Sequence, residues 1–401
     1  MNGSGEGGAA DEHQHPRPLL ASRLQRFGVT IFAEMSALAE RTGSINLGQG
    51  FPDSDGPAVM ADAAVRAIRD GRNQYPPGLG TPELRAAIAA HQQRFYGLAF
   101  DPDLEVLVTA GATEAIAAAM LALCQPGDEV VMFEPAYDSY APAVAMAGAT
   151  RRVVPLRPPE WSFDVDELAA AITPRTRLLL LNSPHNPTGK VFNAEELHVI
   201  AEVCVGADLL VVTDEVYEHL VFEGRHIPLA SLPGMAERTL TVSSAGKTFS
   251  FTGWKIGWVC GPEAMVAAVR TVKQFLTYVN GAPFQPAVAV GLGLPDEVFA
   301  QAASDLALRR DRLCAGLLEA GFEVFRPMAT YFAVTDVRAL GFDDGVAFCR
   351  RLPERCGVVA IPASVFYDDP ATGRSLVRFA FCKSLETIDA AVGRLGTLRM
   401  E

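Results

Sequence analysis

The sequence predicts an α/β fold, with a large domain built on a mostly parallel sheet sandwiched by helices and a smaller α+β domain. Three observations predict this fold. The length of 401 residues suits two domains. From about residue 102 to residue 261, short apolar runs alternate with Ala-rich stretches. After residue 261 the pattern changes to longer helical segments, followed by short runs rich in Val and Phe.

Six apolar runs are the expected strands of the large sheet. Each has four to six mostly aliphatic or β-branched residues, and they cover residues 106–109, 129–133, 177–182, 209–214, 239–244 and 256–261. Continuous apolar strands of this kind are typical of a parallel sheet that is covered on both faces. In such a sheet we expect ligands beyond the carboxyl ends of the strands.

The C-terminal part is expected to form most of the smaller domain. A helix over residues 262–279 and a longer one over 295–320 precede the strand-like segments FEVF, TYFAVTDV, VVAIP and LVRFAFC, and a last helix begins near Leu385. We expect residues 19–54 and 291–401 to form the small domain and residues 55–290 the large one. Residues 1–18 are rich in Gly and polar side chains, which predicts a disordered tail.

Composition and charge exclude several classes of function. The net charge is −13, from 34 basic and 47 acidic residues, which argues against a nucleic-acid or anionic-membrane partner. No apolar run reaches the length of a membrane helix, and the N-terminus lacks the features of a signal peptide. Seven scattered cysteines without a CxxC pair predict reduced thiols and a cytoplasmic protein. Metal binding by His13 and His15 in the tail is a minor alternative, and no other metal site is expected.

Polar clusters follow three of the expected strands. They are NSPHNPTG at residues 182–189, TDEVY at 213–217 and SSAGKTFSFTGWK at 243–255. Each alone could be an ordinary turn, but strand ends of one parallel sheet meet at one edge. The third cluster also holds two of only five lysines, Lys247 and Lys255. A lysine can lose its proton and form a Schiff base with an aldehyde, which an arginine cannot do.

The motifs together resemble a known family, the fold type I, pyridoxal-phosphate-dependent class I/II aminotransferases. SSAGKTFSFTGWKIGW is the most similar segment, and NSPHNPTGKVF, TDEVYEHL, NLGQGFPD, NQYPPGLG and LVRFAFCK add to it in the family's order. The resemblance runs from about Leu19 to the C-terminus. Within the family, the sequence is similar to kynurenine, glutamine and methionine aminotransferases and to the N-succinyldiaminopimelate aminotransferases of lysine biosynthesis.

The resemblance implies roles for four residues around the cofactor ring. Lys247 matches the lysine that binds the cofactor aldehyde and later moves the substrate proton. Asp214 matches the carboxylate that keeps the pyridine nitrogen protonated. Its alternatives are a helix N-cap role and replacement by neighbouring Glu215. Asn186 and Tyr217 match the two donors to the phenolic oxygen, although a turn and a core role are alternatives for them.

The resemblance also implies a phosphate site and a dimer. Backbone N–H groups of Ala112 and Thr113 at a helix N-terminus, the Ser244 hydroxyl and the Lys255 amine match the phosphate ligands. Tyr75 matches a tyrosine that reaches the phosphate from the other subunit, so a homodimer with shared active sites is expected. Without that role, Tyr75 would be an ordinary loop aromatic.

Further residues match the substrate side of the site. Tyr137 matches the aromatic stacked on the cofactor ring, with core packing as its alternative. Arg378 matches the arginine that binds the substrate α-carboxylate, and Gly50 matches a backbone contact to the same group. Family alignment also implies that Phe32, Tyr278 and Asn280 lie near the pocket for the substrate side chain. In one alternative, Phe32 comes from the partner chain.

The expected function is transamination by a ping-pong mechanism with pyridoxal 5'-phosphate. An L-amino acid gives its α-amino group to the cofactor, and a 2-oxo acid, 2-oxoglutarate or pyruvate, receives it. N-succinyldiaminopimelate and aromatic, sulfur-containing or glutamine-type amino acids are the candidate donors. One alternative is a carbon–sulfur β-lyase on the same fold. A more remote one is a non-enzymatic regulatory domain, which the absence of a basic helix-turn-helix segment disfavours.

Overall fold

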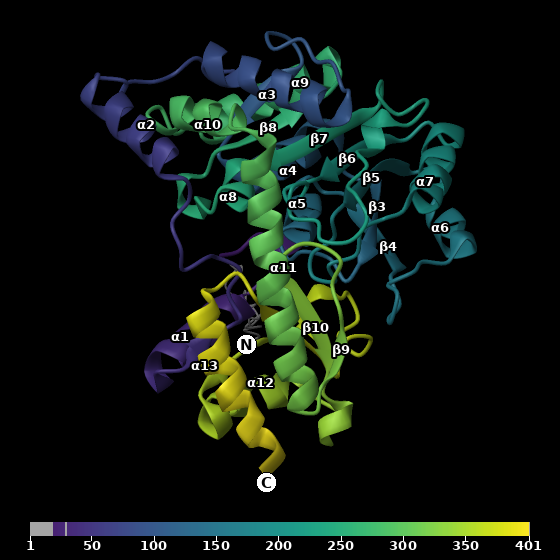
Figure 1. Cartoon of the computed structure of the whole chain (residues 1–401). Coiled ribbons are helices and arrows are strands. Elements are labelled where there is room, and N and C mark those ends of the chain that lie inside the picture. Colours follow the sequence, from purple (N-terminus) through teal and green to yellow (C-terminus); the bar gives the residue numbers. More distant parts are fainter. Residues whose placement is uncertain (1–18, 29, 401) are drawn as a thin grey trace, which may run out of the picture.

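The computed structural model describes residues 19–28 and 30–400. The tail expected at residues 1–18, with His13 and His15, therefore lies outside the described residues. Figure 1 shows a unit built on the large sheet, a second unit built on a smaller sheet, and helix α11 running from one to the other. The exact domain boundaries stay a prediction.

The large sheet has seven strands in the order β2-β8-β7-β6-β5-β3-β4. Strand β8 is antiparallel to both of its neighbours, and the other pairs are parallel. The strands are β2 (Val106–Thr109), β3 (Glu129–Glu134), β4 (Thr150–Pro155), β5 (Thr176–Asn182), β6 (Leu210–Asp214), β7 (Thr239–Ser244) and β8 (Gly257–Cys260). All six expected runs are strands. Strand β4 was not among the expected runs, because it is an edge strand whose two arginines and partial exposure break the apolar pattern.

Helices cover both faces of this sheet, as the continuous apolar strands predict. Alternate strand residues pack on α4 (Gly111–Leu123), α5 (Tyr140–Met146) and α9 (Glu263–Leu276). The opposite face packs on α6 (Val165–Ala171) and α7 (Ala194–Gly206), and on α3 (Pro82–Tyr96) and α10 (Phe284–Leu292) near β2 and β8. Helix α2 (Ala58–Arg69) packs on α10, and α8 (Ala245–Thr248) follows β7.

The smaller unit combines the two ends of the chain. Its antiparallel sheet has the order β12-β13-β10-β9, and β1 pairs in parallel with β11. The strands are β1 (Ile45–Asn46), β9 (Glu323–Phe325), β10 (Phe332–Asp336), β11 (Val358–Val359), β12 (Ile361–Pro362) and β13 (Leu376–Ala380). The helices are α1 (Ile31–Thr42), α11 (Asp296–Glu319), α12 (Gly345–Cys356) and α13 (Leu385–Leu395). Short 3₁₀ turns cover Ser22–Leu24, Leu229–Ser231, Thr252–Trp254, Arg338–Leu340, Ala363–Phe366 and Gly396–Met400.

Local sequence signals set several element ends. Helix α3 begins after Thr81, whose side chain accepts from the Leu84 N–H, and it ends at Gly97 in a left-handed conformation. Helix α7 begins with a capping box between Asn193 and Glu196. These caps satisfy backbone groups that a helix end leaves unpaired.

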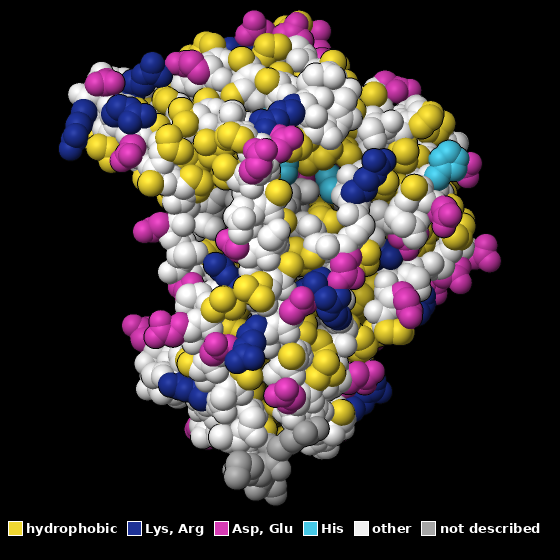
Figure 2. Space-filling model, in the orientation of Figure 1, with side chains coloured by type: hydrophobic (Ala, Val, Ile, Leu, Met, Phe, Trp, Pro, Cys, Tyr) yellow, Lys and Arg dark blue, Asp and Glu magenta, His cyan; other side chains and the backbone are white. Residues whose placement is uncertain are grey.

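The surface mixes both signs of charge. On the face in Figure 2, acidic and basic side chains are interspersed. Among residues 19–28 and 30–400, no helix is both long and apolar enough to cross a lipid bilayer.

Candidate active site

A cavity of about 420 Å³ lies where β5, β6 and β7 end. Twelve of the fifteen residues expected at or near the site line it. They are Phe32, Gly50, Ala112, Thr113, Tyr137, Asn186, Asp214, Tyr217, Ser244, Lys247, Lys255 and Arg378. The register explains part of this convergence, because Asn182 and Asp214 are paired at the ends of neighbouring parallel strands.

Lys247 lies on the short helix α8, directly after β7. Its Nζ donates a hydrogen bond to the Tyr331 hydroxyl at 2.7 Å, and Tyr331 donates to the Gly50 carbonyl at 2.5 Å. Burial lowers the Lys247 pKa to about 8, and the positive charges of Lys255 and Arg378 act in the same direction. A substantial fraction of this amine is therefore neutral near pH 7–8, as a nucleophile or general base requires.

Asp214 ends β6 and is 4% exposed. Tyr140 donates a hydrogen bond to its Oδ2 at 2.7 Å, and the Val216 N–H donates to Oδ1 at 3.3 Å. Burial raises the Asp214 pKa to about 6, although the Tyr140 hydrogen bond favours the ionised form. The N-cap alternative does not hold, since turns and no helix follow this residue.

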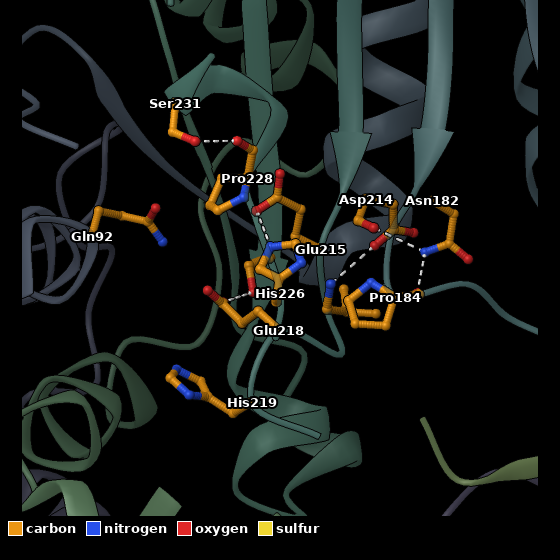
Figure 3. A network of polar contacts seen from close by, with 12 residues as sticks. Gln92, Asn182, Pro184, Asp214, Glu215, Glu218, His219, His226, Pro228 and Ser231 are labelled. Atoms are coloured by element: carbon orange, nitrogen blue, oxygen red, sulfur yellow. Dashed lines mark hydrogen bonds and ion pairs between the residues drawn. The ribbon is translucent and has the colours of Figure 1, made fainter. Parts of the chain in front are cut away.

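Asn182 fixes the segments around Asp214. Its Nδ2 donates to the Asp214 carbonyl at 2.8 Å and to the Pro184 carbonyl at 3.1 Å, as Figure 3 shows. Its Oδ1 accepts from the Asn186 N–H at 2.7 Å. Glu215, the rival carboxylate, forms a hydrogen bond with His226 Nε2 at 2.8 Å and does not line the cavity. The geometry therefore favours Asp214 as the carboxylate that faces a ligand.

The N-terminus of α4 also lines this cavity and offers a candidate anion site. Helix α4 begins at Gly111 with a φ of +75°, and Ala112 and Thr113 follow in its first turn, where backbone N–H groups are unpaired in an α-helix. A Cβ on Gly111 would lie 3.1 Å from Lys255 Nζ, so the amine approaches the backbone closely here. Ser244 adds a hydroxyl to the same wall.

Arg378 lies on β13 and is 1% exposed, without an acidic residue in an ion pair. Its Nη1 donates to Asn186 Oδ1 at 3.0 Å and its Nη2 to the Gly48 carbonyl at 3.2 Å, whereas its Nε has no partner among the described residues. The Phe332 ring centroid lies 3.8 Å from the guanidinium carbon, and two more rings lie around it. A buried guanidinium with a free donor is a favourable site for a carboxylate.

Three residues expected near the site do not line this cavity. Tyr278 lies two residues after α9, which ends at Leu276, and has a left-handed backbone. It is 53% exposed and packs its ring edge-on against Tyr75 at 5.5 Å. Tyr278 does not line the cavity of its own chain, and its role near a side-chain pocket stays a prediction. Asn280 holds the backbone instead, donating to the Thr109 and Lys255 carbonyls. Tyr75 is 81% exposed at the surface, so its phosphate role depends on a second subunit.

Three further residues lie at the site without an expected role. Tyr140 contacts Asp214, Tyr331 contacts Lys247, and Asn182 joins two cavity segments. The spacing of Tyr140 after Tyr137 and the start of NSPHNPTG at Asn182 were visible signals. Tyr331 had none, because it lies on a distant segment of the other unit. Phe32 lines the cavity of its own chain, so the alternative that places it there from the partner is not needed.

Comparison with known proteins decides the family. The family model described as "Aminotransferase class I and II" matches residues 42–395. The chain belongs to the class I and II aminotransferases. It is a transaminase that uses pyridoxal 5'-phosphate, as this family does.

Relatives of this aminotransferase carry related names. A Mycobacterium tuberculosis protein named "Probable N-succinyldiaminopimelate aminotransferase" is 57% identical, over 95% of this chain and 98% of that protein. The methionine aminotransferase of Escherichia coli is 41% identical, over 94% and 98%. A solved structure of N-succinyldiaminopimelate aminotransferase from M. tuberculosis has a TM-score of 0.93 and 57% identity, covering 94% of this chain and all of that one. These names favour an aminotransferase over the β-lyase alternative.

The cavity of this aminotransferase fits the cofactor. An amine of depressed pKa, a buried carboxylate and a helix N-terminus with a neighbouring lysine lie around one space. They suit, in that order, an aldehyde, a protonated ring nitrogen and a phosphate. When bound, the cofactor supplies an electron sink for the bond cleaved at the substrate α-carbon.

Proposed function

We propose that this aminotransferase acts on N-succinyldiaminopimelate and its 2-oxo acid counterpart, with 2-oxoglutarate or pyruvate as the second 2-oxo acid. The observation that carries the proposal is 57% identity, over nearly the whole chain, to the M. tuberculosis protein of that name. The cavity supports it, because its single buried guanidinium is positioned for the α-carboxylate that every amino-acid substrate has.

We propose the following roles within one site. The Lys247 amine binds the cofactor covalently and then, once free, takes the proton from the substrate α-carbon. Asp214 holds the ring nitrogen protonated, with Tyr140 orienting its carboxylate. Asn186 and Tyr217 face the phenolic oxygen, and Tyr137 packs on the ring. The α4 N-terminus, Ser244 and Lys255 hold the phosphate, whereas Arg378 and the Gly50 backbone hold the substrate carboxylate.

The Arg378 surroundings support its role in orienting the substrate. Phe32, Phe332 and Phe366 surround the guanidinium and exclude water, and Asn186 and Gly48 fix its plane by accepting two of its N–H groups. A carboxylate would then meet the free Nε and the open side of the fork. Gly50 allows this close approach, since a Cβ there would lie 2.5 Å from the Phe332 ring.

The same proposal includes a cytoplasmic homodimer. Tyr75 and Tyr278 form an exposed aromatic pair outside the cavity, which suits a surface that a second subunit covers. All seven cysteines are free thiols, which suits a reducing compartment.

A substrate panel tests the proposal. We expect kcat/KM for N-succinyl-diaminopimelate to exceed that for methionine, kynurenine and glutamine by at least ~10-fold, about 1.4 kcal/mol of transition-state binding. Arg378→Lys should lower kcat/KM for every donor, because a single amine cannot replace the guanidinium fork. A preference for methionine or kynurenine would reject the substrate but keep the aminotransferase, and release of pyruvate with ammonia would indicate lyase chemistry.

A further inference from the structure

Three metal-ligating side chains converge behind the segment that carries Asp214. His91 on α3 and the neighbours Glu218 and His219 each bring one ligand atom to within 4.8 Å of the others. The Nε2 atoms of the two histidines lie 2.6 Å apart. His91 and Glu218 are buried, at 2% and 5% exposure, and His219 is half-buried. Figure 3 shows Glu218 and His219 in this network, below the hydrogen bond between Glu215 and His226.

One buried oxygen atom at this cluster has no hydrogen-bond partner. Gln92 places Nε2 3.5 Å from His91 Nδ1, and its own Oε1 accepts no hydrogen bond from the described residues. The Glu218 carboxylate accepts from Ser243 at Oε1, and the Tyr96 phenol lies close enough to interact with it.

We propose that His91, Glu218 and His219 bind one divalent transition-metal ion, for which Zn²⁺ is the best fit. Two imidazole nitrogens and one carboxylate oxygen form a known zinc ligand set that leaves a fourth position for water. His219, which is half-buried, is the ligand nearest to solvent. Nothing in the aminotransferase reaction uses these three side chains, so the site is separate from the cofactor cavity.

Small local movements would complete the site. Zinc–nitrogen bonds of about 2.0–2.1 Å at a tetrahedral angle place two ligand nitrogens about 3.3 Å apart, so the histidines must separate by less than ~1 Å. Once His91 Nε2 binds the ion, its proton must reside on Nδ1. The Gln92 side chain would then turn its amide, and Oε1, the oxygen that now lacks a partner, would accept a hydrogen bond from the His91 Nδ1–H.

The ion would join two elements that flank the active site. His91 belongs to α3, and Glu218 and His219 follow Asp214 and Tyr217 in the same segment. We therefore expect Zn²⁺ to hold this segment to α3 and to raise the melting temperature of the holoenzyme without entering the reaction.

Zinc titration of the chelator-treated holoenzyme against a competing colorimetric indicator tests the proposal. The wild type should bind one Zn²⁺ per chain, and His219→Asn should lower the affinity by at least ~10-fold. The matched control is His198→Asn, because His198 on α7 is exposed and also lies near a glutamate, Glu202. This control should bind like the wild type.

Two measurements separate lost binding from lost folding. Circular dichroism and transaminase turnover of His219→Asn should match the wild type, since this half-buried side chain lies outside the cofactor cavity. Anomalous diffraction at the zinc edge should place the ion between His91 and His219. Equal affinity in the wild type and His219→Asn, or an ion found elsewhere, would overturn the proposal.

Discussion

Tyr331 accepts a hydrogen bond from Lys247 Nζ at 2.7 Å and donates its own proton to the Gly50 carbonyl at 2.5 Å. Because the carbonyl fixes the direction of the phenol proton, an oxygen lone pair faces the lysine. The Lys247 amine is thereby held at a defined place relative to the Gly50 backbone, which we propose as a contact for the substrate carboxylate. Tyr331 is a positioning residue in this arrangement.

Tyr331→Phe should lower kcat by about 10-fold, with a smaller effect on KM, because a hydrogen bond to a charged or reacting amine contributes about 1.5–3 kcal/mol. Steady-state kinetics over a pH range measures kcat and KM for both proteins. The Lys247 pKa should also fall below its wild-type value, since the acceptor that favours the ammonium form is lost. Tyr367→Phe removes a buried phenol outside the cavity and serves as the control. Equal kcat values for both variants would remove the positioning role.

The covalent attachment of pyridoxal phosphate to the cofactor-free protein should become faster as pH rises from 7 to 9. Only the neutral amine attacks an aldehyde, and the Lys247 pKa is lowered to about 8 by burial. The midpoint of the rate profile should therefore lie near 8 rather than 10.5. Stopped-flow absorbance gives the rate. Borohydride reduction and intact mass should show one cofactor per chain in the wild type and none in Lys247→Arg, whereas a midpoint near 10.5 would contradict the environment described for Lys247.

Asp214→Asn should keep the cofactor bound covalently but lose at least ~100-fold in kcat, about 2.7 kcal/mol, because a neutral amide does not hold the ring nitrogen protonated. The visible spectrum reports binding and single-turnover kinetics reports the loss. The control is Asp336→Asn. Asp336 is another buried aspartate at a strand end, on β10 of the smaller sheet, and it forms an ion pair with Arg338. A similar kcat for the two variants would reject the ring-nitrogen role.

Mixing two damaged variants tests whether Tyr75 serves the other subunit. Lys247→Arg removes the reactive amine, and Tyr75→Ala should weaken cofactor binding through a lost phosphate contact. A hybrid dimer would contain one site with both native side chains, so activity at limiting cofactor should rise above that of either variant alone. Light scattering measures the assembly. No gain after subunit exchange, or full activity from a monomer, would place Tyr75 outside the site.

The apolar runs predicted six of the seven strands of the large sheet, and the family resemblance supplied most of the residues that line the cavity. Apolar runs mark buried strands, and the polar residues that end them, such as Asn186, Asp214 and Lys247, meet at one sheet edge whatever the loops do. Tyr331 and the His91–His219 contact depend instead on how distant segments pack, which no local pattern records. Tyr278 packs on Tyr75 outside the cavity of its own chain, so its expected place near a side-chain pocket stays a prediction that depends on a second subunit.

The segment that holds Gly48 and Gly50 is hydrogen-bonded to residues close to the C-terminus. The Leu47 carbonyl accepts from the Ala380 N–H, Arg378 donates to Gly48, and Lys383 Nζ donates to the Phe51 carbonyl. The contact between Arg378 and Gly48 spans 330 residues. During synthesis on the ribosome, the lysine half of the site can form once the large sheet has emerged, but the carboxylate half must wait for residue 378. A nascent chain would thus gain its capacity to bind cofactor well before its capacity to bind amino acids.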